Sequence, residues 1–586
     1  MLKILKYLHP KEWVLAGISL IFIVTQVWLD LKLPDYMAEI TQLVQTPGSE
    51  MKDIWIAGGW MLLCAIGSLI AAFIVGYFAA RIGSSFSQRL RSMIFNKVES
   101  FSMEEVNRFS TSSLITRSTN DITQVQMLIT MALQLVVKAP IMAVWAVIKI
   151  SGKGFEWSLA TGVAVGVLVA VVLLIMMFAL PKFKKMQTLT DNLTRVTREN
   201  LTGLRVVRAY NAEDYQQDKF EAANKELTDT NLFTNRAMAF MMPTMTLIMS
   251  GLPLSIYWIG AYLIRAAEAP DKLLIFSNMV VFSQYAMQVI MAFIMLVMIF
   301  IMFPRASVSA KRINEVVDTE PVIVDGGVTD GKPQQIGEIE FRNVSFKYPG
   351  AAEYVLKNVS FTANHGETVA FIGSTGSGKS TLINLITRFF DATEGEVLVD
   401  GVNVKDYKLE ALYNKIGYVP QKAVLFKGTV SSNVAYGNNG GADYTLDEIQ
   451  KAVKIAQGTD FVEKMDGKYD ASIAQSGANI SGGQKQRLAI ARAVCRKPEI
   501  YIFDDSFSAL DYKTDRILRN ELKRETSGVT SLIVAQRIGT IMDADQIIVL
   551  DEGKVVGKGT HKELLRSCAV YKEIAASQLS EEEMVS

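Results

Sequence analysis

The stretch of sequence that decides the fold of the second half of this chain reads Phe371-Ile372-Gly373-Ser374-Thr375-Gly376-Ser377-Gly378-Lys379-Ser380-Thr381. It matches the pattern G-x-x-x-x-G-K-[ST], in which glycines let backbone N–H groups surround phosphate oxygens. Lys379 is expected to reach the β- and γ-phosphates, and Ser380 to bind Mg²⁺. The apolar run 368–372 predicts the buried strand before such a loop, and the helix that starts at the loop would turn its positive end toward the phosphates. The sequence therefore predicts a nucleotide-binding α/β domain.

Length and composition divide the chain into two halves. Its 586 residues, half of them hydrophobic, are too many for one core, and the long apolar runs end at about Met302. A net charge of +1 without a long basic tract argues against nucleic acid as a partner. The three cysteines lie far apart and form no metal or disulfide pattern. The charged start Met1–Trp13 leads into an apolar run long enough to span a bilayer, so we expect no cleavable signal peptide.

Six segments have about the 20 apolar residues that a bilayer-spanning helix needs. The expected spans are Val14–Leu33, Ile54–Ala80, Met127–Ile150, Trp157–Leu180, Ala239–Ile264 and Leu274–Phe303. Two links, 81–126 and 181–238, are long and rich in Lys and Arg, whereas the other links are short. By the positive-inside rule, these two links and both termini are expected in the cytosol, with the chain crossing the cytoplasmic membrane. Both links keep helical periodicity, so the membrane helices are expected to continue beyond the bilayer.

Polar and methionine side chains mark three of these segments. Methionines recur every three or four residues along the sixth segment, which fits packing or lipid contact, or else an adaptable wall for apolar ligands. Gln284 and Gln288, one turn apart, would be costly against lipid and favour a cavity-facing side. Asp30 and Lys32 lie near the outer end of the first segment, and we expect them to reach the interface rather than bind a cationic substrate.

The remainder of the chain has the pattern of a soluble α/β domain. We predict a membrane domain at 1–306, a polar linker at 307–336, a nucleotide-binding domain at 337–580 and a tail at 581–586. The run 499–504 predicts a buried parallel strand that ends in Asp504, where a Mg²⁺-binding carboxylate belongs. Before this strand stands the glycine-containing run Ile480-Ser481-Gly482-Gly483-Gln484.

The Ser-Gly-Gly-Gln run, placed between the two nucleotide motifs, resembles the signature of ATP-binding-cassette (ABC) proteins. Nearly the whole chain resembles a half-transporter of the ABC exporter class. The resemblance implies a polytopic α-helical membrane domain with six transmembrane helices, followed by an α/β P-loop cassette that uses ATP and Mg²⁺. It also implies a second half-transporter as partner, because such cassettes dimerise head to tail. The signature residues would then contact the ATP held by the partner's phosphate loop: Ser481, Gly482, Gly483 and Gln484.

The resemblance assigns roles to further residues. Tyr348 matches the aromatic that stacks on adenine, and Gln421 matches the glutamine that contacts Mg²⁺ and links to the membrane helices. Asp511 belongs to a loop that crosses to the partner cassette, and the segments 117–121 and 209–214 resemble cytosolic elbows that dock onto cassettes. The metal ligands would be Ser380, Gln421 and Asp504. Counted over both ATP sites of such a dimer, the nucleotide-binding residues of this chain would be Tyr348, Gly373, Ser374, Thr375, Gly376, Ser377, Gly378, Lys379, Ser380, Thr381, Asp504, Ser481, Gly482, Gly483, Gln484 and Asp511.

Three residues depart from the family's pattern. Asp505 follows Asp504 where the family has a glutamate that polarises the attacking water, and a carboxylate displaced by about 1 Å can cost on the order of a hundredfold in rate. Gln536 replaces a histidine that contacts the γ-phosphate, and an amide cannot carry a proton or a charge there. Gln475 replaces a glutamate upstream of the signature, and this change affects the expected connection between the cassette and the elbows. The ATP-binding residues are intact and the hydrolytic pair is altered, which resembles the degenerate-site subunit of a bacterial heterodimeric exporter.

We therefore predict a subunit of an ATP-driven exporter of amphipathic, drug-like molecules, with a heterodimer favoured over a homodimer. In this chain's own site, Asp505, Gln536 and Gln421 occupy the catalytic positions, and hydrolysis is expected to be weak. Multidrug export is not the only interpretation. A lipid or peptide exporter remains an alternative, as does a regulatory or sensor subunit that gates without pumping.

Overall fold

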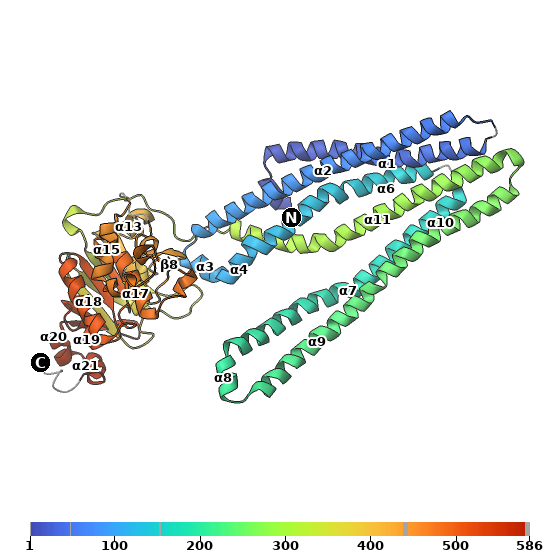
Figure 1. Ribbon diagram of the computed structural model, residues 1–586. Helices are drawn as coiled ribbons and strands as arrows, with labels where there is room; N and C mark the ends of the chain where they lie inside the picture. Colours follow the sequence, from blue (N-terminus) through green and yellow to red (C-terminus); the bar gives the residue numbers. More distant parts are fainter. Residues whose placement is uncertain (1, 47, 152–153, 438–442, 580–586) are drawn as a thin grey trace. The chain divides into compact units, whose positions relative to one another are not determined.

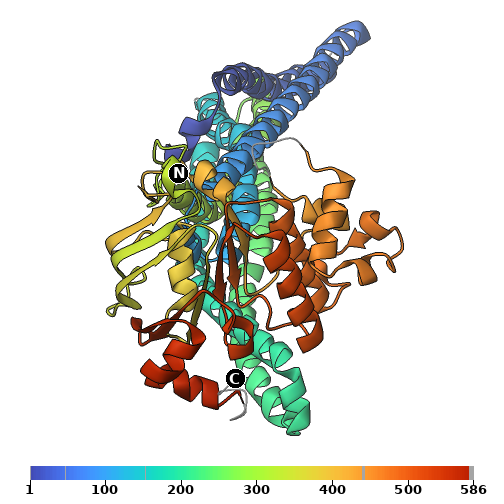
Figure 2. The same cartoon turned by 90° about the vertical axis from the view of Figure 1, so that its left-hand side faces the viewer.

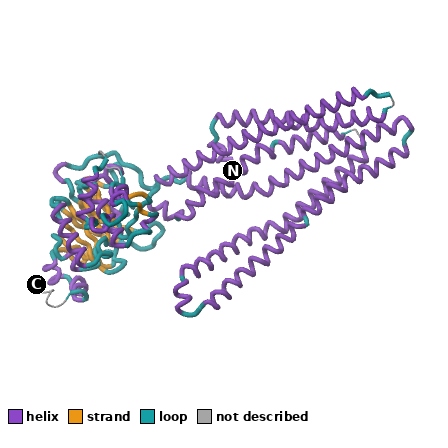
Figure 3. The backbone as a smooth tube through the Cα atoms, in the orientation of Figure 1, coloured by secondary structure: helices purple, strands orange, loops and turns teal. Residues whose placement is uncertain are grey.

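The computed structural model describes residues 2–46, 48–151, 154–437 and 443–579, so the predicted tail 581–586 lies outside the described residues. The chain divides into two compact units, one formed by 1–99 and 112–319, the other by 100–111 and 320–586. In the described residues, strands occur in the second unit, whereas the first is helical (Figure 3). The predicted fold class, a helical membrane domain followed by an α/β P-loop cassette, is confirmed.

Long apolar helices build the first unit (Figure 1). They are α1 (Pro10–Gln45), α2 (Met51–Glu99), α5 (Ile122–Met131), α6 (Lys138–Ile150), α7 (Phe155–Thr202), α9 (Glu213–Ala239), α10 (Met241–Ala266) and α11 (Ala269–Val317). Shorter elements join them: η1 (Leu2–Tyr7), α4 (Thr111–Thr116), η2 (Arg117–Asp121), η3 (Ala132–Val136) and α8 (Leu204–Ala209). Six stretches of the described chain are long and apolar enough to cross a membrane, as predicted. Helices α2 and α7 continue past the predicted spans to Glu99 and Thr202.

Helix α11 forms the centre of the first unit. Half of its apolar window is buried, against less than a quarter in the other candidate spans, because it packs on α1, α6 and α10. Its burial continues beyond the membrane-spanning part through Ala310, Ile313 and Val316, which follow one another at helical spacing. The segment 307–336 was predicted as a linker, but its first residues belong to the end of α11. The first compact unit ends at Thr319.

Two carboxylates of α1 form ion pairs inside the helical bundle. Asp30 lies 3.1 Å from the Lys138 ammonium, and Asp35 lies 2.6 Å from that of Lys149. The buried Tyr285 hydroxyl donates a hydrogen bond of 2.5 Å to Asp35. Charged groups in a membrane span are costly unless they are paired. The pairing with Lys138 explains why Asp30 is held within the bundle, which differs from the expectation that it reaches the interface.

The two glutamines of α11 differ in their surroundings. Gln288 Nε2 donates to the backbone oxygen of Asp30 over 3.2 Å. Gln284 is exposed, as are Met291 and Met298, which follow it at intervals of seven residues and therefore lie on the same face of the helix. The exposed side of α11 thus carries Gln284 and methionines, whereas Gln288 contacts α1.

Three sheets build the second unit. The strands are β1 (Ile339–Phe346), β2 (Leu356–Ala363), β3 (Thr368–Gly373), β4 (Glu394–Val399), β5 (Val402–Asn403), β6 (Ile416–Val419), β7 (Gly428–Thr429), β8 (Ser472–Ile473), β9 (Ile500–Asp504), β10 (Thr530–Val534), β11 (Gln546–Asp551) and β12 (Lys554–Gly559). An antiparallel sheet has the order β2-β1-β4-β5, and β7 pairs with β8. The main sheet has the order β12-β11-β3-β10-β9-β6, and β12 runs antiparallel to β11 whereas the other neighbours are parallel (Figure 2).

Helices surround this main sheet. They are α12 (Lys379–Ile386), α13 (Leu409–Lys415), α14 (Val430–Val434), α15 (Leu446–Ile455), α16 (Thr459–Val462), α17 (Gly482–Cys495), α18 (Tyr512–Glu525), α19 (Ile538–Ile541), α20 (His561–Ser567) and α21 (Ala569–Ala576). Short turns form η4 (Pro333–Gln335), η5 (Lys468–Asp470) and η6 (Gln475–Gly477). In the main sheet, β3, β10 and β9 are parallel neighbours, and Val534 pairs with both Phe371 and Asp504. The phosphate loop, Asp504 and the segment after β10 therefore all lie at the carboxyl ends of these parallel strands.

Helix α3 (Met103–Phe109) belongs to the second unit although it follows α2 in sequence. The buried Glu105 fixes it, since its carboxylate accepts a 3.0 Å hydrogen bond from Val322 N–H and a 2.7 Å bond from Ser102 N–H. The segments 117–121 and 209–214, which the resemblance named as elbows, lie within the first unit. The segment 100–111 was not singled out from the sequence.

Candidate nucleotide site

The phosphate loop turns sharply from β3 into α12. Gly378 caps this helix at φ +99°, and a Cβ there would approach Leu356 Cδ2 to 2.7 Å, so a larger residue does not fit. Lys379 lies inside the loop and donates to the carbonyl oxygens of Gly373 (2.9 Å) and Ser374 (2.7 Å) and to Ser377 Oγ (3.2 Å). Burial lowers the pKa of the Lys379 ammonium, while two nearby carboxylates oppose the shift. The loop thus holds a cation next to a set of backbone N–H groups.

Two of the three predicted metal ligands are in contact. Ser380 Oγ donates to Asp504 Oδ1 over 3.0 Å. Burial raises the pKa of the Asp504 carboxyl, while the hydrogen bond from Ser380 and the nearby Lys379 ammonium oppose this shift. A hydroxyl and a carboxylate suit Mg²⁺, which takes most of its remaining ligands from water and nucleotide phosphates. Within the described chain, no group of three His, Cys, Asp or Glu residues could hold a metal ion by itself.

Asp505 is held by two amide side chains. Gln421 Nε2 and Gln536 Nε2 both donate to Asp505 Oδ2, over 3.2 Å and 3.0 Å. The backbone of Asp505 has φ +47°, a left-handed conformation uncommon for a residue with a side chain. Burial raises the pKa of its carboxyl. The structure therefore brings the three predicted catalytic residues together, since Gln421 and Gln536 bind the same oxygen atom of Asp505. Gln421 thus contacts Asp505 rather than the pair formed by Ser380 and Asp504.

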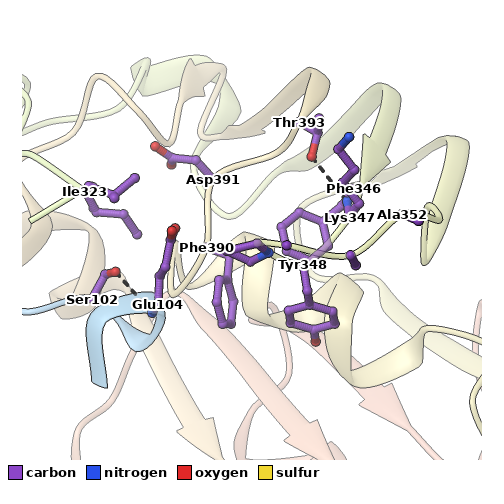
Figure 4. A pocket seen from close by; sticks show the side chains of 14 residues that line it. Ser102, Glu104, Ile323, Phe346, Lys347, Tyr348, Ala352, Phe390, Asp391 and Thr393 are labelled. Carbon is purple, nitrogen blue, oxygen red and sulfur yellow. Dashed lines mark hydrogen bonds between the residues drawn. The ribbon is translucent and has the colours of Figure 1, made fainter. Parts of the chain in front are cut away.

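A cavity of about 540 Å³ is lined by the aromatic residues Phe346, Tyr348 and Phe390 (Figure 4). The Tyr348 hydroxyl is 2.9 Å from Thr381 Oγ1, and its ring meets Phe346 and Phe390 edge to face at 5.0 Å and 5.3 Å. Glu104 of α3 lines the same cavity. Such a cavity has the size and the aromatic surface for a nucleotide base. Sequence reasoning missed Phe390 and Glu104, since neither belongs to a motif.

The signature residues lie at an exposed helix start. Ser481 and Gln484 cap α17 reciprocally: Ser481 Oγ accepts from Gln484 N–H, and Gln484 Oε1 accepts from Ser481 N–H over 2.9 Å. Gly483 passes the backbone of Ala509 closely, since a Cβ at Gly483 would lie 3.3 Å from the Ala509 carbonyl oxygen. Asp511 caps α18 by accepting from Thr514 N–H over 3.0 Å. The hydrogen bonds of these residues are local, so they do not join the group around Lys379 and Asp504.

Comparisons with known proteins agree on one family. The model of the ABC transporter transmembrane region matches residues 16–293, and that of the ABC transporter matches residues 356–508. An uncharacterized ABC transporter ATP-binding protein of Mycobacterium tuberculosis is 41% identical over 80% of this chain and 79% of its own length. YfiB of Bacillus subtilis, an uncharacterized ABC transporter ATP-binding protein, is 37% identical over 99% of both chains.

Two further similar proteins are named for a function. The ATP-dependent lipid A-core flippase of Pseudomonas fluorescens is 34% identical over 80% of this chain and 76% of its own. A solved structure of a bacterial Atm1-family ABC exporter with ATP bound superposes with a TM-score of 0.80, at 24% identity, over 97% of this chain and 98% of the other. At that identity the superposition shows a shared fold.

Proposed function

The chain belongs to the ABC transporter family, and from this premise we propose that it is the degenerate-site half of a heterodimeric exporter of amphipathic molecules. The family gives the coarser function: an exporter that binds and hydrolyses ATP and works as a dimer in a membrane. The proposal goes further in two respects: which of the two ATP sites hydrolyses ATP, and which class of molecule is transported.

The position of Asp505 is the observation that carries the proposal. A carboxylate that activates water must turn an unoccupied oxygen toward it. Asp505 is one methylene shorter than glutamate, and Oδ2 already accepts from Gln421 and Gln536. The shorter side chain opposes activation of water, whereas Lys379, Ser380 and Asp504 keep the arrangement needed to hold ATP and Mg²⁺. We infer that this chain's site retains ATP and hydrolyses it slowly.

The other ATP site would use the signature of this chain. Ser481–Gln484 form an exposed helix start, which is suited to bind a phosphate presented by another chain. A partner with a glutamate after its Walker B aspartate would supply the hydrolytic step there. ATP would then shift the population between two conformers by binding one of them more tightly. With cassettes on the ATP side, both termini would lie in the cytosol and the helices in the cytoplasmic membrane.

The transported molecule is proposed to be amphipathic. The exposed side of α11 carries Gln284, Met291 and Met298, a polarizable surface with one amide. Lipid export is the second candidate, and it is favoured by the similarity to proteins named lipid A-core flippases. A fluorescent lipid and a fluorescent drug-like cation, compared in inverted membrane vesicles, would separate the two.

ATP turnover by the purified full-length chain tests the proposed division of work. Reconstituted alone, the chain should bind ATP but hydrolyse it far more slowly than about 1 s⁻¹, the lower end of ordinary enzyme turnover. The chain carrying Lys379→Ala is the control for binding. Isolation of the tagged chain from its own membranes should bring a second half-transporter with it. Rapid hydrolysis by a dimer of this chain alone would refute the degenerate site, and recovery of this chain alone would refute the heterodimer.

A further inference from the structure

The C-terminal helices pack against the segment that carries Gln536. Helix α19 begins two residues after Gln536, and α20 and α21 end the described chain beside it (Figure 1). Ile538 and Ile541 share one apolar core with Leu564 and Tyr571 of the two last helices. The segment after β10 is therefore supported by the C-terminus of the cassette.

Gln578, which follows α21, binds this segment through both ends of its amide. Its Nε2 donates to the backbone oxygen of Gln536 over 2.8 Å, and its Oε1 accepts from Ile538 N–H over 2.8 Å. A glutamine amide is planar and offers a donor and an acceptor side by side, so the two bonds fix both the position and the orientation of the backbone. The side chain is exposed, so burial does not hold it there.

The hydrogen bonds continue from Gln536 to the hydrolytic position. The side chain of Gln536 donates to Asp505 Oδ2, and its backbone oxygen accepts from Gln578. Rotation of the Gln536 backbone would therefore move the amide that contacts Asp505. Coupled hydrogen bonds of this kind transmit a local displacement.

Helix α21 is itself firmly anchored. The Tyr571 hydroxyl lies 2.7 Å from His561 Nδ1, and both side chains are buried. This contact ties α21 to α20, so Gln578 projects from a fixed base rather than from a free end.

We propose that Gln578 is a positioning residue that sets the amide of Gln536 and thereby the time for which this chain's site retains ATP. It acts through Gln536 and does not itself touch the nucleotide. The inference depends on ATP binding by the cassette, and it does not depend on slow hydrolysis or on a heterodimer.

Two variants and a matched control test this role in the full-length chain in lipid nanodiscs. Gln578→Ala removes both bonds, and Gln578→Glu keeps the acceptor and loses the donor. Ser577→Ala is the control, because Ser577 Oγ donates only locally, to Ile574 O over 2.7 Å. The measurements are hydrogen exchange of peptides covering 536–541 and the release rate of radiolabelled ATP with Mg²⁺.

Gln578→Ala should speed exchange and ATP release by about threefold to tenfold, the effect of losing one net hydrogen bond. Gln578→Glu should show at least as large an effect at pH 7, because a carboxylate oxygen replaces the donor that faces the carbonyl oxygen of Gln536. It should approach the unmodified chain as the pH falls toward about 4.3, because a protonated carboxyl regains the donor. A merely structural residue would give no such recovery.

Two results would overturn the inference. Unchanged exchange at Ile538 in the Gln578→Ala chain would show that the contact does not restrain this segment. Faster exchange with unchanged ATP release would show that the contact does not govern the site. Should Gln578→Ala fail to fold, the pH response of Gln578→Glu decides the question. The turnover of the unmodified chain tests the proposed function separately.

Discussion

Restoring the hydrolytic pair should convert the slow ATP site into a faster one. The change is Asp505→Glu together with Gln536→His. In the structure, Asp505 Oδ2 accepts from two amides at 3.2 Å and 3.0 Å, so one of the two oxygens of this short carboxylate is occupied. A glutamate would extend past these donors, and the histidine would remove one of them while adding a group that can carry a proton at the γ-phosphate.

The size of the effect follows from two opposing terms. Correcting a misplacement of about 1 Å can recover on the order of a hundredfold in rate, equal to about 2.7 kcal/mol of barrier. Breaking a hydrogen bond to Gln421 would cost about 0.5–1.5 kcal/mol against this gain. The net expectation is an increase in turnover of about eightfold to fortyfold. ATP affinity should change less, because Lys379, Ser380 and Asp504 are untouched.

Phosphate release by the reconstituted full-length chain measures this gain. Adding Lys379→Ala to the double variant should abolish it, which assigns the activity to this chain's phosphate loop. Asp447→Glu, the same chemical change at an exposed position of α15, is the matched control and should have no effect. If the double variant binds ATP normally and its turnover stays within about twofold of the unmodified chain, residues 505 and 536 are not the limitation.

Three further changes test the pH response, the attachment of α3 and the ion pairs of the membrane helices. Because burial raises the pKa of Asp504, its ionised form costs stability at pH 7, and this cost disappears as the pH falls through the raised pKa toward about 3.9. Asp504→Asn should therefore raise the melting temperature of the nucleotide-free chain at pH 7 but hardly near about pH 3.9; an equal gain at both pH values would contradict this. Glu105→Ala should destabilise the cassette by about 1–3 kcal/mol in a denaturation assay by removing the hydrogen bonds that the buried carboxylate accepts from Val322 and Ser102, whereas Asn107→Ala on the exposed side of α3 should be neutral. Asp30→Asn should cost about 3 kcal/mol by leaving the Lys138 ammonium unpaired, and Asp30→Lys with Lys138→Asp should recover much of this loss; equal instability of the swapped pair would argue against an ion pair.

The parallel core of the cassette could be predicted because each of its strands can be recognised from its own short stretch of sequence. The runs 368–372 and 499–504 are short, apolar and bounded by polar residues, and they became β3 and β9 with shifts of about one residue. Once these strands are parallel, their carboxyl ends must meet, which places Asp504 next to Ser380. Local pattern and topology were sufficient for this part of the site.

The contacts around Asp505 could not be predicted in the same way. Gln421 lies 84 residues and Gln536 31 residues from Asp505 in the chain, and no periodicity links them. The hydrogen bonds of Gln578 to Gln536 and Ile538 also join residues far apart in the sequence. The same is true of Glu104 and the aromatic residues with which it lines the cavity. The ion pair between Asp30 and Lys138 spans 108 residues, so hydropathy could mark each residue as unusual without naming its partner. Side-chain pairing depends on the packing of helices, and one sequence does not encode that in its spacing.

The signature lies at the start of α17, and its side-chain hydrogen bonds do not join the group around Lys379 and Asp504. Ser481 uses a lone pair of Oγ to accept from Gln484 N–H, which leaves its hydroxyl hydrogen available as a donor. The same helix, α17, presents unpaired N–H groups and the positive end of its dipole at Gly482 and Gly483. No neighbouring atom lies within 4 Å of a side-chain carbon built at Gly482, so an approaching phosphate would meet open space there. If the signature binds the nucleotide of a partner chain, as proposed, the loop around Lys379 and the signature of this chain would serve two different molecules of ATP.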